Sequence, residues 1–159
     1  MTDDATFEEG GEAPLRLRAL DSADLDVISS LIQDAVLKVG EIRWDRRKRR
    51  LALLLNRFRW EDLPNARARK RGLERVQTVL SIEDVLAVRS QGLNRDDTEV
   101  ILSVLSVAFE PAKDGTGRVV LTLAGDGAIA AFVESLEVLL RDVTRPYLAP
   151  SGKAPTHPE

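Results

Sequence analysis

Residues 41–62 read EIRWDRRKRRLALLLNRFRWED, and this stretch decides the predicted fold. Apolar residues alternate with polar ones on both sides of five consecutive cations, which is the period of a half-buried strand. The alternation changes phase at Gly40-Glu41 and again at Asn56-Arg57, as it does at a bulge. Two such segments joined by a polar connection indicate a β-hairpin with strands at 37–44 and 51–60 and a tip at 45–50. A continuous helix from Arg43 to Trp60 is the competing interpretation, and the β-forming flanks favour the hairpin.

On the N-terminal side, the sequence predicts a strand followed by an amphipathic helix. LRLRAL at 15–20 alternates apolar and basic residues, as a strand with one exposed face does. Asp21 is a good N-cap, and Asp24 stands where a capping box has its acidic partner. Apolar residues then recur at helical spacing: Leu25, Ile28, Leu31, Ile32 and Ala35.

On the C-terminal side, the sequence predicts a polar connection at 63–72 and then a run of strands. These strands are expected at 73–80, 84–91, 100–109 and 118–124, and at 128–134 after the GDG turn. SLEVLLRDV at 135–143 has helical spacing and Ser135 as an N-cap, so a C-terminal helix is expected. The predicted fold class is α+β, with an antiparallel β-meander or barrel of about seven strands between the N-terminal strand and helix and the C-terminal helix. By its element count alone, this arrangement is similar to the pleckstrin-homology-like barrel.

The domain organisation follows from composition. Residues 14–145 are expected to form a single α+β domain, preceded by an acidic disordered tail at 1–13 and followed by a proline-rich tail at 146–159. The chain has 159 residues, of which 43% are hydrophobic and 31% charged, as expected of one globular domain.

Several classes of site are excluded by composition. There is no cysteine, and the single histidine is His157, so a disulfide framework, a zinc site on Cys or His, and Ser-His or Cys-His catalysis are excluded. No loop has the ligand spacing of a calcium or magnesium site, and no metal or cofactor is expected. The acidic N-terminus lacks the pattern of a secretory signal, and no apolar run reaches the ~18 residues of a membrane span. A cytoplasmic, bacterial-type protein is therefore expected.

Charge is distributed very unevenly along the chain. Residues 43–71 hold twelve cations and three anions, for a net charge of +9, whereas the whole chain carries −3. Such a segment projects a positive patch that an anionic partner can recognise. The predicted residues for binding an anionic partner are Arg46, Arg47, Lys48, Arg49, Arg50, Arg57, Arg59, Arg67, Arg69, Lys70 and Arg71.

Each part of this predicted surface has a plainer interpretation. The tip is equally consistent with a solvated turn that protects the hairpin from pairing with other chains, and 67–71 with an exposed loop. Phe58 and Trp60 could stack on bases beside Arg57 and Arg59, but core packing is favoured because they continue the alternating apolar face. The acidic stretch NRDDTE at 94–99 is interpreted as a turn rather than a metal site.

The chain resembles a family of small alphaproteobacterial proteins known only as a domain of unknown function. The resemblance covers 15–147 and is carried by LxALDSADLDVISSLIQDAV at 17–36, LLLNRFRWE at 53–61, VLAVRSQGLNR at 85–95, GDGAI at 125–129 and LEVLLRDV at 136–143. It implies no activity and no catalytic residues.

The sequence therefore favours a non-catalytic binding module whose basic hairpin contacts an acidic protein or RNA. A membrane surface is a less favoured partner because no exposed apolar insertion motif accompanies the tip. The alternative is an enzyme with an Asp- or Glu-based site in the barrel mouth; converging carboxylates in a cleft would indicate it. No small-molecule ligand and no oligomeric state is assigned by the sequence.

Overall fold

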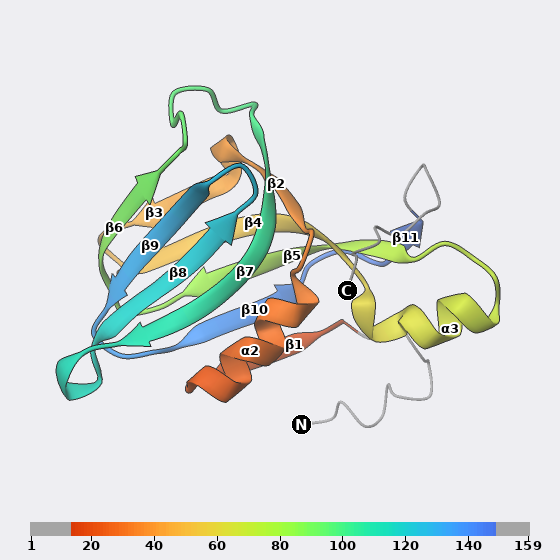
Figure 1. The fold of residues 1–159 in the computed structure, drawn as a ribbon, viewed down its shortest axis with the longest axis horizontal. Coiled ribbons are helices and arrows are strands. Elements are labelled where there is room, and N and C mark those ends of the chain that lie inside the picture. Colours follow the sequence, from red (N-terminus) through yellow and green to blue (C-terminus); the bar gives the residue numbers. More distant parts are fainter. Residues whose placement is uncertain (1–13, 149–159) are drawn as a thin grey trace.

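The computed structural model describes residues 14–148, which form a strongly curved antiparallel sheet with few helices (Figure 1). The fold is thus α+β and rich in strands, as predicted. In chain order the elements are β1 (Arg16–Ala19), α2 (Ser22–Leu31), β2 (Val36–Lys38), η2 (Val39–Glu41), β3 (Ile42–Asp45), β4 (Arg50–Phe58), η3 (Trp60–Asp62), α3 (Leu63–Ala68), β5 (Glu74–Ile82), β6 (Val85–Gln91), β7 (Ile101–Pro111), η4 (Lys113–Gly115), β8 (Gly117–Leu123), β9 (Gly127–Val133), β10 (Val138–Asp142) and β11 (Tyr147–Leu148).

The described strands pair in the order β1-β10-β5-β4-β2-β7-β8-β9-β6, with β11 attached to β5 and β3 attached to β4. Every ladder is antiparallel. The predicted hairpin is confirmed, because Ile42 pairs with Leu53 and Asp45 pairs with Arg50 across β3 and β4. The first predicted change of phase is a single 3-10 turn, η2, which separates β2 from β3. This turn lets β2 pair with β7 while β3 leaves the β7 side of the sheet.

Helix α2 forms for the reasons that the sequence indicates. The Asp21 carboxylate accepts a hydrogen bond from the Asp24 amide at 2.8 Å, which caps the first turn. Leu25 and Ile28 are fully buried, and the helix packs against β1 and β7. Its apolar face closes the main core, which is otherwise built from alternate residues of the strands.

The predicted C-terminal helix at 135–143 is wrong. These residues contain β10, which pairs with β1 on one side and β5 on the other. Val138 and Leu140 are buried, while Arg141 is exposed, so the period is two. In a segment this short, apolar spacing separates helix from strand poorly, and two available ladders decide in favour of the strand. Without that helix, the element count that suggested a pleckstrin-homology-like barrel no longer applies.

Two further differences concern the connections. The segment predicted as a polar connection at 63–72 begins with the short helix α3, which has Pro64 in its first turn. A small second core of Phe58, Ala66 and Leu73 holds α3 against the end of β4. β11 pairs with β5, so residues 147–148 of the predicted proline-rich tail are joined to the sheet. The predictions for residues 1–13 and 149–159 lie outside the described residues.

Candidate binding site

The tip of the β3–β4 hairpin (residues 46–49) has a defined conformation. The Asp45 carboxylate accepts a hydrogen bond from the Lys48 amide at 3.0 Å, and the Arg49 amide donates to the Arg46 carbonyl at 3.3 Å. Arg49 adopts a positive φ of 55°, which closes the turn. The side chains of Arg46, Arg47 and Lys48 are exposed, so this short turn holds three adjacent cations toward solvent.

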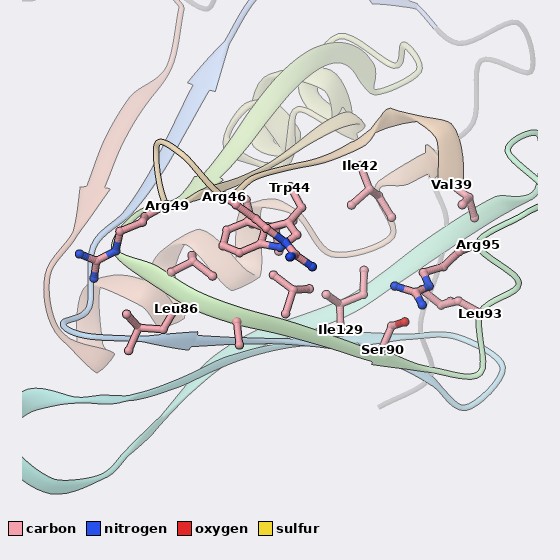
Figure 2. A pocket seen from close by; sticks show the side chains of 14 residues that line it. Val39, Ile42, Trp44, Arg46, Arg49, Leu86, Ser90, Leu93, Arg95 and Ile129 are labelled. Carbon is pink, nitrogen blue, oxygen red and sulfur yellow. The ribbon is translucent and has the colours of Figure 1, made fainter.

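A groove lies beside this hairpin, between the edge strands β3 and β6 (Figure 2). Its volume is about 610 Å³. Ile42 and Trp44 enter it from β3, Val88 from β6 and Ile129 from β9. Because β3 pairs only with β4 and β6 only with β9 among the described strands, neither strand covers the space between them. We call this space the β3–β6 groove.

Both ends of the β3–β6 groove are closed. At the hairpin end, the Val85 amide donates to the Arg49 carbonyl at 2.8 Å. At the other end, the chain turns after β6 and carries Leu93 and Arg95 into the lining. Gly92 makes this turn with a φ of 71°, and a β-carbon there would lie 3.0 Å from the Asp126 carbonyl oxygen. The turn therefore needs glycine for both its conformation and its close approach to the β8–β9 connection.

The charged residues that line the groove are all arginines: Arg46, Arg49 and Arg95. None of the described lining residues is Asp or Glu. Arg49 has its own carboxylate partner, Glu134, whose hydrogen bond raises the pKa of Arg49. Arg46 and Arg95 form no ion pair with any residue in 14–148. Figure 2 shows these two side chains reaching toward each other along the groove, while Arg49 points away.

The structure divides the predicted basic surface into three groups. The first is the tip, with Arg46, Arg47 and Lys48 exposed. Beside it, Arg50 donates from Nε to both oxygens of Glu83, at 2.9 and 3.0 Å. Arg49 and Arg50 thus have local carboxylate partners, which leaves Arg46, Arg47 and Lys48 as the cations of 46–50 that form no ion pair within residues 14–148.

The second group, Arg57 and Arg59, is not on the surface at all. Arg57 has no exposed area, and its guanidinium bonds Glu61 at 2.9 Å, Asp142 at 3.1 Å and the Thr78 hydroxyl at 3.1 Å. Burial alone would lower the pKa of Arg57, but the hydrogen bonds and charges of Glu61 and Asp142 outweigh it and raise the pKa. The strand continues in phase through Arg57, so the predicted second change of phase is wrong.

Arg59 is buried in the same region and forms ion pairs with Asp62 and Glu74. Burial would raise the pKa of Asp62, but the hydrogen bonds from Arg71 and Asn65 and the charges of Arg59 and Arg71 lower it. Arg57 and Arg59 are therefore held inside the molecule by carboxylates. We remove both from the predicted partner-binding surface.

The third group starts in the last turn of α3 and lies at the far end of the molecule from the tip (Figure 1). β4 separates the two groups, and its nine residues span roughly 27 Å. Arg67, Arg69 and Lys70 are exposed, whereas Arg71 donates to Asp62 at 2.6 Å. The expectation that 67–71 and the tip form one basic surface is wrong, because an extended strand lies between them.

The plainer interpretation of the aromatic residues is confirmed for Phe58 and Trp60. Phe58 is buried in the second core, and Trp60 donates from its indole nitrogen to the Gln33 carbonyl at 2.9 Å. Trp44 differs from both, because it is half-buried and faces the groove. NRDDTE at 94–99 forms turns in which the Asn94 side chain accepts from the Asp96 amide, as the turn interpretation expects.

The groove itself was not predicted from the sequence. Leu93 and Arg95 fall in a segment recognised only as a strand and its exit, and a single sequence does not reveal that β6 faces β3. A signal was present in VLAVRSQG: a strand with apolar residues on both faces that ends at a glycine. Such a strand is buried on both faces or has a partner along its edge.

Comparison with known protein families shows the family to which this chain belongs. Residues 15–157 match the model of a family described as "Protein of unknown function (DUF2948)". The chain belongs to this family. The sequence-based resemblance to a domain of unknown function is thereby confirmed, while a bacterial origin stays a prediction. No curated protein and no solved structure gives a significant match to this DUF2948 chain.

Two observations concern the classes of function still open to a DUF2948 protein of this fold. Within residues 14–148, no helix combines the length and the apolar character required to cross a bilayer. In the same part of the chain, His, Asp and Glu do not gather in groups of three or more that could hold a metal ion.

Proposed function

We propose that the protein is a non-catalytic binding module whose β3–β4 hairpin contacts an acidic surface on another protein. The observation that carries the proposal is the tip: Arg46, Arg47 and Lys48 are adjacent and exposed, and they have no ion pair within residues 14–148. Three neighbouring cations repel one another, and a polyanionic partner relieves this repulsion.

An acidic protein fits the tip better than RNA does. Proteins that hold single-stranded nucleic acid combine cations with exposed aromatic rings on which bases stack. Here Phe58 and Trp60 pack at the other end of β4, and Trp44 faces the groove rather than the tip. The tip therefore offers charge without a stacking surface. RNA is the alternative partner that the experiment distinguishes.

The enzyme alternative has less support. It required converging carboxylates in a cleft, and the lining of the β3–β6 groove contains arginines and Ser90 as its polar residues. The alternative placed that site in the mouth of a barrel, whereas the groove beside the hairpin has only arginines as its charged lining residues. The groove thus fits binding of an anion better than acid–base chemistry by Asp or Glu.

The test is a pull-down from native lysate with three proteins: wild type, Arg47→Glu with Lys48→Glu, and Arg67→Glu with Arg69→Glu. Both variants reverse two exposed charges, but at opposite ends of β4. The proposal expects a captured protein that survives nuclease, weakens as salt increases, and is lost only with the tip variant.

Two results would change this conclusion. If nuclease releases the partner and log affinity falls linearly with log salt by about one unit per phosphate contact, the partner is RNA. If both variants retain the partner as well as wild type does, the tip is a solvated turn.

A further inference from the structure

We infer that the β3–β6 groove is a binding site for a small amphiphilic carboxylate: a compound with an aliphatic body and one carboxylate. The body would lie on Trp44, Val88 and Ile129, and the carboxylate would be held between Arg46 and Arg95. This site shares Arg46 with the tip, but it can be tested apart from the protein contact proposed above, because Arg47 and Lys48 do not line the groove.

The size and lining of the groove are those of a small-molecule site. Its volume of about 610 Å³ lies within the range of roughly 300–1,000 Å³ that ligand pockets occupy. Leu51, Val85 and Ile129 are almost fully buried and form an apolar floor, and Trp44 and Leu93 form half-buried walls. An aliphatic chain placed there removes its own surface and that of the walls from water.

The charges of the groove select an anion. Arg46 and Arg95 come from opposite ends of the groove, and their side chains are directed toward each other (Figure 2). Neither forms an ion pair with a residue in 14–148, and no carboxylate of the described lining residues stands between them. A planar carboxylate accepts two parallel hydrogen bonds from a guanidinium, so an anion placed here meets two well-matched donors.

The closed ends favour a compact ligand over an extended peptide. Strands with free edges, such as β3 and β6, can accept a peptide as an added strand. Such a peptide would have to continue beyond the groove, but the bond from the Val85 amide to the Arg49 carbonyl closes one end. The turn that carries Leu93 and Arg95 closes the other, fixed by the close approach of Gly92 to Asp126. A ligand shorter than the groove fits without breaking either closure.

The experiment is isothermal titration calorimetry of the full chain with decanoate, kept below the concentration at which it forms micelles. Decanol is the uncharged control of equal length. We expect saturable binding of decanoate to one site, with decanol about tenfold weaker or more, because a charge-assisted contact is lost. Shortening the chain to octanoate should weaken binding by about tenfold, since each buried methylene contributes about threefold to fourfold.

Matched variants locate the site. Arg46→Gln and Arg95→Gln should each weaken decanoate about tenfold and leave decanol unchanged. Arg47→Gln removes the same charge from the neighbouring position outside the groove and should bind decanoate as wild type does. Amide chemical shifts should move in residues 42–44, 85–88 and 93–95 on titration with decanoate, and not in α3.

The inference is overturned if decanoate shows no saturable binding, or if Arg46→Gln and Arg95→Gln bind it as well as Arg47→Gln does. It is also overturned if an acidic peptide moves the amide shifts of β6 and decanoate does not, because the groove is then a strand-addition site. Loss of the pull-down partner in the Arg47→Glu, Lys48→Glu protein concerns the tip alone, so the two proposals fail independently.

Discussion

The two ends of β4 carry arginines with opposite surroundings. At its start, the hairpin tip holds Arg46 and Arg47 in solvent beside an apolar groove. At its end, Arg57 and Arg59 are buried and bonded to carboxylates. All four come from one basic stretch of sequence, so residue type does not determine the role. The difference shows that an arginine inside the sheet is a structural residue when carboxylates from other elements reach it.

The largest expected effect is at the buried end. Arg57→Met leaves Asp142 in the interior without its cation, although the Thr78 hydroxyl and the Leu15 amide still donate to that carboxylate. Breaking a buried pair in this way costs about 3–5 kcal/mol. Urea unfolding should show this loss, whereas Arg47→Met should change the free energy of unfolding by less than about 0.5 kcal/mol. Equal losses in the two variants would remove the distinction between the ends.

The groove end can be altered without changing any charge. Gly92→Ala forces a positive φ on alanine and places its β-carbon against the Asp126 carbonyl and the Gly127 backbone. We expect a loss of about 1–2 kcal/mol in urea unfolding. Because the turn carries Leu93 and Arg95, decanoate binding should weaken as well. A variant as stable as wild type that also binds decanoate normally would show that the turn does not depend on glycine.

The fold class, the hairpin and helix α2 could be predicted because each rests on local chemistry. The Asp21 cap and the alternation across 37–44 and 51–60 act between residues close in sequence. The burial of Arg57 and its bonding to a carboxylate could not be predicted in this way, because Asp142 and Thr78 reach it from β10 and β5. The strand at 138–142 was missed for the same reason: its ladders with β1 and β5 are long-range.

The candidate site was predicted in part. A basic tip is visible in the sequence, and Arg46, Arg47 and Lys48 are exposed as expected. The groove is not visible, because it depends on η2 turning β3 away from β7 and toward β6. Arg95 was therefore not among the predicted binding residues, although it reaches into the same groove as Arg46.

At the end of β4 that holds Arg57, pH should have a smaller effect on the free energy of unfolding, through Glu61. Burial would raise the pKa of Glu61, but the hydrogen bond and charge of Arg57 outweigh burial and hold this pKa below its usual value. The ionised carboxylate therefore stabilises the fold above the unfolded pKa of about 4, and this contribution is lost as pH falls through the lower folded pKa. Glu61→Gln should lose about 1 kcal/mol at pH 7 and show a shallower decline in stability below pH ~4. An unchanged slope in acid unfolding experiments would contradict this assignment.

The smallest expected effect on stability is at the tip. Arg47→Gln with Lys48→Gln removes two exposed charges that form no ion pair within residues 14–148. The free energy of unfolding should change by no more than about 0.5 kcal/mol, as for ordinary surface substitutions, so the melting temperature should change little. Thermal unfolding at low and high salt checks this. A large destabilisation would mean that these cations stabilise the fold and are not free to bind a partner.

The measurement that tests the comparison most directly is the rate at which each arginine of the native protein reacts with phenylglyoxal, followed by mass spectrometry of proteolytic peptides. We expect Arg46 and Arg47 to react quickly, and Arg57 and Arg59 to be protected until the chain is unfolded in urea. Decanoate should slow the reaction at Arg46 and Arg95 and not at Arg47. Rapid native modification of Arg57, at the rate of Arg47, would contradict the account.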